Sequence, residues 1–409
     1  MKIIIFIILI FINTLSQSVF SIQTKIYWNI PTDVCKSNGI NIPLENYSII
    51  FNDEQHFYGE KIVTLYEKNV GLYPYLIKIN DSHNQLINGG LPQNVDLDKH
   101  IEKLKKNINI LIPNKKFNGL AIIDIEKWRP LFEANWLSKK IYQKESINNV
   151  FQNFSNASQS TSIKLGEKQF NEGALNFMIK TIKVCKLLRP FAKWGFYGFP
   201  ICDMNGDKRK NQYCYYDINN KLIQFLKYVD ALYPTAYIYE GHSYNNQKIY
   251  INRVLKEAKR LNKLLQKFRY GKKEIYIFHK IEISNKVSEN KKNNFYDPYQ
   301  LCISYGQSIA KEIEGIVIWS TSNDISKRCE IIKQYVELQL GTYLEEFNKL
   351  YDKCRDRTHI HEVCHRLKIS REDYMCNNFL TSNSIKEWCN VKFYDEKCRL
   401  PENNLTKSV

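Results

Sequence analysis

Residues 119–126 read Gly-Leu-Ala-Ile-Ile-Asp-Ile-Glu, and this stretch indicates the fold class. The apolar run at 120–123 is continuous, as is typical of a parallel β-strand that is buried on both faces. It ends in Asp124, and Glu126 follows two residues later, so strand periodicity places both carboxyl groups on the same side. We therefore predict a buried parallel strand that carries two neighbouring carboxyl groups at its C-terminal end.

Similar strands recur along the chain and alternate with helical patterns. β-Branched or aromatic runs occur at residues 25–28, 62–66, 120–124, 192–197, 231–238, 274–278 and 315–320. Helical patterns occur at 98–109, 169–188, 249–266 and 298–313. Strands that alternate with helices favour an α/β fold with a parallel sheet, and about seven such units favour a distorted TIM-like (β/α) barrel. The polar stretch 146–168 is interpreted as a surface excursion.

The chain divides into three parts by composition. Residues 1–21 carry Lys2 and then an apolar run of about ten residues, which predicts a signal peptide and a secreted protein. An uncleaved membrane anchor is the alternative. Residues 22–341 hold the barrel pattern. Residues 342–409 hold five of the eleven cysteines and little apolar material, so we expect a small cysteine-rich, disulfide-stapled appendage there.

The charge balance predicts a polyanionic partner. Lysine and arginine number 59 against 42 acidic residues, a net charge of +17, which suits nucleic acid, an anionic membrane or an acidic polysaccharide. Secretion and the lack of nucleic-acid-binding motifs argue against nucleic acid. No stretch after the signal peptide is apolar enough to cross a membrane. We expect an acidic polysaccharide.

Five sequons fit the secretory route and are candidate glycosylation sites. They begin at Asn46, Asn80, Asn153, Asn156 and Asn404.

The two carboxyl groups suggest glycosidase chemistry. In a βα barrel the C-terminal ends of the strands form the active-site face. Two carboxyl groups held close together cannot both ionise easily, so the pKa of one should rise and leave a neutral acid that can protonate a leaving group. The alternative is that Asp124 and Glu126 cap the following helix or pair with Arg129.

Motifs along the whole barrel region resemble those of the animal hyaluronidases, the family found in insect venoms and on sperm. Besides residues 119–136, the resemblance lies in 27–35, 89–94, 189–202, 232–237 and 318–319, in the family's order. It implies a secreted endo-β-N-acetylhexosaminidase that hydrolyses β-1,4 bonds between N-acetylhexosamine and glucuronate in hyaluronan. It also implies retention of configuration and no cofactor, and we expect a monomer.

The resemblance also implies a role for each candidate residue. Glu126 would be the general acid and base. Asp124 would orient the substrate's own N-acetyl group, which attacks the anomeric carbon in place of an enzymic nucleophile, and Tyr197 would hydrogen-bond that group. The substrate-binding candidates are Tyr66, Arg129, Tyr237, Arg253 and Trp319. For the two tyrosines at 197 and 237 the alternative is a core aromatic, and for Arg253 it is a solvated helix face.

The cysteines are expected to fall into two groups. The resemblance implies barrel disulfides, which would join Cys35 to Cys329 and Cys202 to Cys214. Cys185 is interpreted as a buried free thiol, and Cys302 either pairs with the tail or is free.

Two residues depart from the family pattern. Ile125 replaces an aromatic residue between the carboxyl groups, and Asp203 replaces a tyrosine after Cys202. Both lie where a preference between hyaluronan and chondroitin could be set.

Three alternatives stay open at this point. One is a chondroitin hydrolase of the same family. Another is a catalytically inactive glycosaminoglycan-binding paralogue, although retention of both carboxyl groups and Tyr197 argues against it. The third is a zinc protease, because residues 361–365 read His-Glu-Val-Cys-His. That motif lies in a cysteine-dense tail without the scaffold of such a site, so we expect no metal.

Overall fold

A computed structural model describes residues 24–80, 83–154, 156, 158–207, 212–283 and 294–346. The predicted signal peptide lies outside the described residues. So do the His-Glu-Val-Cys-His motif, the five tail cysteines and Asn404.

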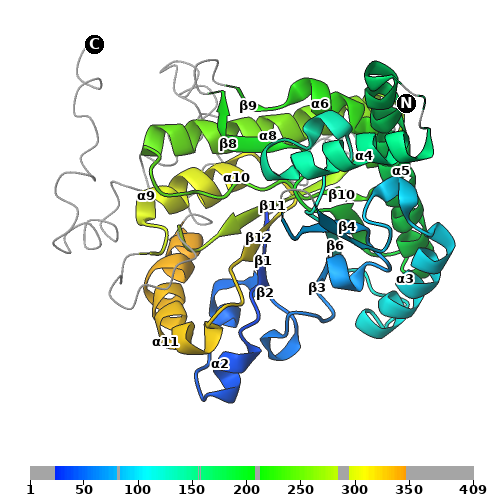
Figure 1. Cartoon of the computed structure of the whole chain (residues 1–409). Helices are drawn as coiled ribbons and strands as arrows, with labels where there is room; N and C mark the ends of the chain where they lie inside the picture. The colour runs from blue at the N-terminus through cyan, green and yellow to red at the C-terminus, as the bar shows by residue number, and fades with distance from the viewer. Residues whose placement is uncertain are drawn as a thin grey trace, which may run out of the picture.

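Parallel strands form the inside of the fold, and helices surround them (Figure 1). One parallel sheet contains β3 (Ile62–Tyr66), β6 (Leu120–Asp124) and β7 (Lys193–Phe196). The other contains, in spatial order, β10 (Ala231–Leu232), β11 (Glu274–Lys280), β12 (Gly315–Trp319), β1 (Lys25–Asn29) and β2 (Ile49–Ile50). All seven predicted strands are confirmed, although the run at 231–238 is a regular strand only over its first two residues. The predicted α/β barrel is therefore confirmed.

The two sheets meet at two seams. At one seam Tyr197 forms a parallel bridge with Tyr233, which continues β7 toward β10. At the other seam side chains join the strands. Thr64 on β3 donates a 2.7 Å hydrogen bond to the Asn29 side chain on β1. Asn52 donates to the carbonyl of Ile62 at 2.8 Å and accepts from its amide at 3.0 Å. The barrel is distorted at this seam because buried amide and hydroxyl groups replace a regular backbone ladder.

Helices of unequal length cover the outside of the strands (Figure 1). The bounds are α2 (Asp33–Ser37), α3 (Leu97–Leu111), α4 (Lys140–Asn153), α5 (Gln159–Leu188), α6 (Tyr216–Lys221), α7 (Ile223–Leu226), α8 (Tyr244–Lys267), α9 (Pro298–Leu301), α10 (Gln307–Ala310) and α11 (Ile325–Tyr335). A π-helical segment, Cys302–Gly306, joins α9 to α10. Two antiparallel hairpins are also present, β4 (Tyr75–Lys78) with β5 (Asn84–Ile87) and β8 (Cys202–Asp207) with β9 (Gln212–Cys214).

Residues 146–168 lie mostly at the surface, as predicted, but they form helices rather than an irregular excursion. Most of them belong to α4 and α5, and Ser146, Ser162 and Gly166 are buried between neighbouring elements. A side chain at Gly166 would lie 3.1 Å from the Ser146 carbonyl oxygen, so the glycine lets the two helices approach closely. Polar and small residues at this contact concealed the helical pattern.

The strands bury alternate side chains on their two faces. On β6, Leu120 and Ile122 belong to the cluster inside the barrel, whereas Ala121 and Ile123 belong to the larger cluster between strands and helices. The interior cluster also contains Tyr27, Ile62, Ala231, Tyr233, Tyr237, Tyr276, Phe278 and Val317. This alternation decides which side chains reach the C-terminal mouth of the barrel.

Both predicted barrel disulfides are present. Cys35 on α2 is bonded to Cys329 on α11, and Cys202 is bonded to Cys214 across the β8–β9 hairpin. Cys185 is a buried free thiol, as predicted. Cys302 is disulfide-bonded, so of the two predicted states the free one is wrong.

Candidate active site

Five side chains form a layer where the interior face of the barrel ends. They are Tyr66 on β3, Asp124 on β6, Tyr197 after β7, Lys280 on β11 and Trp319 on β12. Each one lies two positions after a residue that faces the barrel interior, so its own side chain points to the same side of the strand. The strand register places Tyr66 beside Asp124 and Lys280 beside Trp319. Alternation and register together bring residues that lie far apart in the sequence to one mouth.

Asp124 and Glu126 both have raised pKa values. Burial raises the pKa of Asp124 well above its usual range, and the charges of Glu126 and Glu67 add to this effect. Solvent reaches the Glu126 side chain, yet the protein atoms around its carboxyl group raise its pKa, and Lys139 opposes that rise. The pair can therefore hold a proton that isolated carboxyl groups would lose.

The backbone of Glu126 is held by the side chains of Glu67 and Lys139. Its amide donates a 3.3 Å hydrogen bond to the carboxylate of Glu67, and its carbonyl accepts a hydrogen bond from the Lys139 ammonium group. These contacts fix the segment after β6. They leave the Glu126 carboxyl group available to a substrate.

Tyr197 and Tyr237 form a hydrogen-bonded pair beside the carboxyl groups. The hydroxyl of Tyr197 donates to that of Tyr237 at 3.1 Å. Burial raises the pKa of both hydroxyls well above the usual range, and Asp124 and Glu126 raise them further. Both tyrosines therefore stay protonated, and the hydrogen of Tyr197 is the one that the Tyr237 hydroxyl accepts. Tyr197 is half-buried, so it is not a plain core residue.

Trp319 forms a wall of the cleft with aromatic neighbours on both sides. Its indole nitrogen donates a 3.1 Å hydrogen bond to the Tyr66 hydroxyl, and its ring stacks on Tyr237 with centroids 6.0 Å apart. The Lys280 ammonium group lies 5.4 Å from the Trp319 ring centroid and 5.0 Å from that of Tyr237. This network holds the indole in one orientation.

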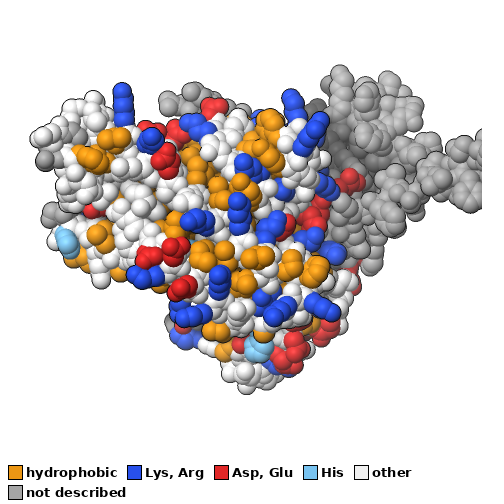
Figure 2. Space-filling view, turned by 90° about the vertical axis from the view of Figure 1, so that its right-hand side faces the viewer, with side chains coloured by type: hydrophobic (Ala, Val, Ile, Leu, Met, Phe, Trp, Pro, Cys, Tyr) orange, Lys and Arg blue, Asp and Glu red, His pale blue; other side chains and the backbone are white. Residues whose placement is uncertain are grey.

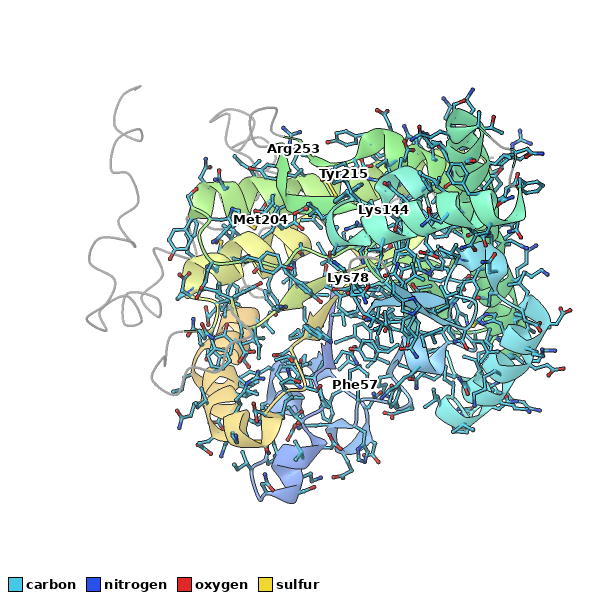
Figure 3. All side chains as sticks on the ribbon, viewed as in Figure 1. Phe57, Lys78, Lys144, Met204, Tyr215 and Arg253 are labelled. Atoms are coloured by element: carbon cyan, nitrogen blue, oxygen red, sulfur yellow. A yellow bond between two sulfur atoms is a disulfide. The ribbon has the colours of Figure 1, made fainter. Side chains whose placement is uncertain are left out.

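The two candidate arginines occupy different places. The Arg129 guanidinium donates to the carbonyl of Ala134 at 3.0 Å and lies 4.5 Å from the Trp136 ring centroid. Burial lowers the pKa of Arg129, and the negative charges of Asp203 and Glu126 are among the groups that oppose this, so Arg129 lies near the catalytic candidates. Arg253 lies on α8, near the edge of the molecule in Figure 3. It is not among the residues that line the cleft described below, and it forms no hydrogen bond or ion pair with Asp124 or Glu126 in the described part of the chain.

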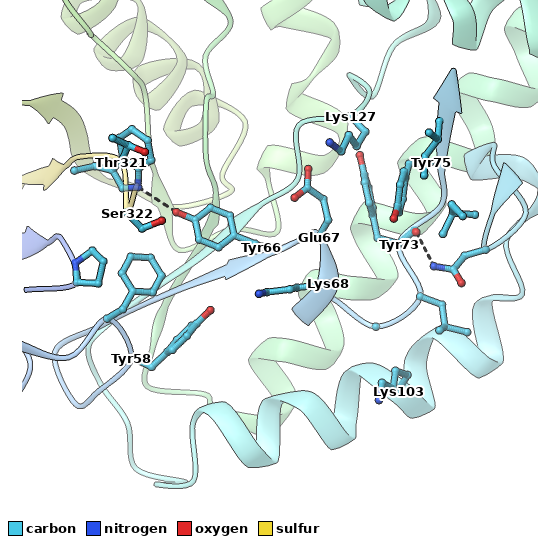
Figure 4. Close-up of a pocket in the computed structure, with 18 of the residues that line it drawn as sticks. Tyr58, Tyr66, Glu67, Lys68, Tyr73, Tyr75, Lys103, Lys127, Thr321 and Ser322 are labelled. Carbon is cyan, nitrogen blue, oxygen red and sulfur yellow. Dashed lines mark hydrogen bonds between the residues drawn. The ribbon is translucent and has the colours of Figure 1, made fainter. Parts of the chain in front are cut away.

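A cleft of about 1080 Å³ is lined in part by Tyr66 and Trp319, and Figure 4 shows it with Tyr66 labelled. Its lining includes Tyr58, Tyr73 and Tyr75, the acid Glu67, and residues 320–322 after β12. Three lysines also line it, at positions 68, 103 and 127. The size and the aromatic lining suit an extended ligand.

Sequence reasoning did not identify Lys280, Glu67 and Lys139 as site residues. Lys280 was missed because the strand was predicted to end at Phe278, although the same alternation of two would have placed it at the mouth. Glu67 and Lys139 lie on segments that approach Glu126 only after folding, and no sequence signal marks them.

Positive charge is scattered over the face of the molecule that Figure 2 shows. On the face that carries α3, α4 and α5, lysine and arginine side chains are scattered among apolar and acidic ones (Figure 2). The net charge of the chain therefore does not by itself locate a binding site.

The described residues bear on the predicted glycosylation sites and on possible membrane-spanning and metal-binding segments. The sequons at Asn46, Asn80, Asn153 and Asn156 begin with exposed asparagines. No helix in the described ranges is long and apolar enough to span a membrane. The same ranges contain no group of three or more potential metal ligands.

Comparison with known proteins gives three consistent results. Residues 15–402 match a family described as hyaluronidase. A chondroitin hydrolase of Caenorhabditis elegans is 34% identical over 81% of this chain and 72% of its own length, and a hyaluronidase of Loxosceles intermedia is 31% identical over 82% of each. Bee venom hyaluronidase, solved in complex with a hyaluronic acid tetramer, has a similar structure, with a TM-score of 0.73, 26% identity, and coverage of 80% of this chain and 99% of that one.

Proposed function

The chain belongs to the hyaluronidase family of glycosidases, and from this premise we propose that it hydrolyses β-1,4 bonds between N-acetylhexosamine and glucuronate in an acidic polysaccharide. Hyaluronan is the first candidate substrate. The observation that supports this most directly is the proton-holding pair Asp124 and Glu126 beside Tyr197, Tyr237 and Trp319 at the mouth of the barrel.

In the first step Glu126 is the general acid. Its carboxyl proton passes to the glycosidic oxygen as the bond from that oxygen to the anomeric carbon breaks. The carbonyl oxygen of the substrate's own N-acetyl group forms a new bond to the anomeric carbon from the opposite face. No enzymic nucleophile is needed.

Asp124 and Tyr197 act on the N-acetyl group during this step. Positive charge develops on that group as its carbonyl oxygen attacks, and the Asp124 carboxyl group next to it stabilises the charge and orients the amide. The Tyr197 hydroxyl is kept protonated by burial, so on substrate binding it can turn its hydrogen from the Tyr237 hydroxyl to the same group. Trp319 bounds the space beside the acetamido methyl.

In the second step Glu126 is the general base. Its carboxylate takes a proton from water, and the resulting oxygen attacks the anomeric carbon while the bond from the acetamido oxygen breaks. Two successive inversions retain the β configuration. The second proton transfer returns Glu126 to its acid form.

The Glu126→Gln variant tests the enzymatic proposal against a glycosaminoglycan-binding protein without activity. Release of reducing ends from hyaluronan should fall by at least about 10²-fold, because glutamine has no proton to transfer. Glu133→Gln, which removes an exposed carboxylate paired with Lys221, is the matched control and should retain activity. Equal activity of wild type and Glu126→Gln, or none in either, would contradict the proposal.

Chondroitin is the second candidate substrate, because the Caenorhabditis elegans relative is a chondroitin hydrolase. Hyaluronan and chondroitin differ at the C4 hydroxyl of the hexosamine. Parallel digestion of hyaluronan and unsulfated chondroitin by the same preparation decides between them. The ratio of the two kcat/KM values is the quantity to compare.

The secreted location and the domain boundaries complete the proposal. We infer that residues 1–21 are removed as a signal peptide, that residues 22–341 form the catalytic barrel, and that residues 342–409 form a cysteine-rich tail. The presence of Ile22 at the amino terminus of protein from the culture medium would support this, and retention of Met1 would contradict it. Zinc content and activity after chelation test the motif at residues 361–365.

A further inference from the structure

The cleft beside Tyr66 and Trp319 has a lining of distinctive charge. Lys68 follows β3, Lys103 lies on α3, and Lys127 follows Glu126 on the segment after β6. Three separate segments thus contribute one cation each to the same hollow, and all three side chains are solvent-exposed. Figure 4 shows Lys68 and Lys127 on either side of Glu67, with Lys103 on α3.

These cations are not neutralised within the described structure. None of the three lysines forms an ion pair with a described residue, and the charged nitrogen of Lys127 lies 5.9 Å from the Tyr75 ring centroid. Glu67 is the acidic residue that lines this cleft in the described ranges, and its carboxylate already accepts the amide of Glu126. The hollow therefore presents three positive charges against one negative charge.

Lysine recognises charge rather than shape. An ammonium group is a compact point charge on a flexible stem, whereas arginine presents a rigid fork that fits a planar carboxylate. No arginine lines the cleft in the part of the chain that the structure describes. This lining should therefore respond to the number of anionic groups on the ligand. A hexosamine–glucuronate repeat carries one carboxylate, and a sulfate ester adds a second anion.

We propose that Lys68, Lys103 and Lys127 form an anion-binding extension of the catalytic cleft that favours sulfated hexosamine–glucuronate chains over unsulfated ones. The extension shares Tyr66 and Trp319 with the catalytic mouth, so a chain bound there continues toward Glu126. Tyr58, Tyr73 and Tyr75 supply rings against which sugar faces can pack. The inference rests on the proposed function and specifies its substrate class.

The test measures binding separately from turnover. The Glu126→Gln chain is titrated with size-matched chondroitin oligosaccharides, one set sulfated and one set unsulfated. Lys68→Gln with Lys103→Gln is introduced into this chain, and Lys127 is kept because it adjoins position 126. Each lysine should contribute about two- to fivefold to sulfated-ligand affinity. We expect the double change to weaken sulfated binding by roughly tenfold and unsulfated binding by much less.

The matched control removes two lysines outside the cleft. Lys105 lies two residues after Lys103, so it projects from another side of α3, and Lys115 lies in the loop before β6, at the opposite end of that strand from Asp124. Lys105→Gln with Lys115→Gln loses the same charge and should leave both affinities nearly unchanged. An equal loss of sulfated affinity in this control would assign the effect to general surface charge and overturn the proposal.

The remaining outcomes also decide the matter. Equal weakening of sulfated and unsulfated binding by the cleft variant, or no weakening of either, would overturn the inference. A wild-type chain that cleaves none of the polymers would contradict the proposed function, while the binding comparison would still test the extension. Near-ultraviolet circular dichroism of each variant verifies that the fold is kept.

Discussion

The buried carboxyl group of Asp124 makes the stability of the fold depend on pH. Burial raises the pKa of Asp124, so the folded state favours its protonated form. The stability associated with such a group is present at acidic pH and is lost as pH rises through the folded-state pKa. At neutral pH, therefore, the carboxyl group of Asp124 lowers the free energy of unfolding.

Asp124→Asn is expected to make the protein more stable and less active. The amide cannot ionise, so the gain in unfolding free energy should be roughly 1–3 kcal/mol at pH 7. It should diminish below about pH 4, where the carboxyl group is protonated in both states. Urea unfolding at the two pH values measures the difference. A gain of the same size at both pH values would show that ionisation of Asp124 is not its cause.

Lys139 provides a second test at the level of single residues. Its positive charge opposes the rise in the pKa of Glu126, and its ammonium group bonds the Glu126 carbonyl. Lys139→Met should raise the pKa of Glu126 further, so the acid form persists to higher pH and the alkaline limb of the kcat profile moves upward. Lys139→Arg keeps the charge and should leave the limb in place. An unchanged alkaline limb of the kcat–pH profile in the Lys139→Met variant would contradict this account.

The catalytic residues could be predicted from the sequence only where a strand pattern ran through them. A spacing of two placed Asp124 and Glu126 on one side, and the structure finds their charges interacting. The charge of Lys139 acts on the carboxyl group of Glu126, but the position of Lys139 depends on the path of the chain after β6. That path is set by tertiary contacts rather than by a local pattern.

At the level of secondary-structure elements, the segment after β12 is held by a buried ion pair. Arg328 on α11 donates to both carboxylate oxygens of Glu282, at 2.7 and 2.6 Å, and to the Ser320 hydroxyl at 2.9 Å. Both charged side chains are more than nine-tenths buried. Arg328 also donates to the carbonyl of Thr321 at 3.2 Å. The loop after Trp319, which lines the cleft at residues 320–322, is therefore held in place by Arg328.

Arg328→Met should destabilise the protein by roughly 3–5 kcal/mol, because it leaves the carboxylate of Glu282 buried without its partner. Adding Glu282→Leu should recover much of this loss, since the second charge is then removed as well. Chemical denaturation of the two variants and wild type measures both effects. If the double variant were no more stable than the single one, the unpaired charge would not be the cause.

The elements were predictable to the extent that their apolar residues were periodic. Strands such as β6 are buried on both faces, and their unbroken apolar runs are visible in the sequence. The contact between α4 and α5 was missed because it is built from Ser146, Ser162 and Gly166, which resemble loop residues. Small and polar residues allow close helix approach, but they carry no hydrophobic signal.

At the level of the whole molecule, β1 and β12 bring the two ends of the barrel together. The five residues of β1 pair in parallel with those of β12, although nearly the whole barrel sequence separates them. Cys35 follows β1 and Cys329 lies on α11, after β12, so their disulfide joins the same two ends covalently. The bond spans 294 residues, whereas Cys202–Cys214 spans 12.

Removal of the long disulfide should therefore destabilise the protein more than removal of the short one. In the chain-entropy model the long loop corresponds to about 6 kcal/mol and the short loop to about 3 kcal/mol, because a closed loop restricts the unfolded chain more as it lengthens. Cys35→Ala with Cys329→Ala is compared with Cys202→Ala with Cys214→Ala by denaturant unfolding under oxidising conditions. The reverse order would mean that the short bridge acts mainly on the folded hairpin, where Cys202 and Cys214 face each other across β8 and β9, rather than on the unfolded chain.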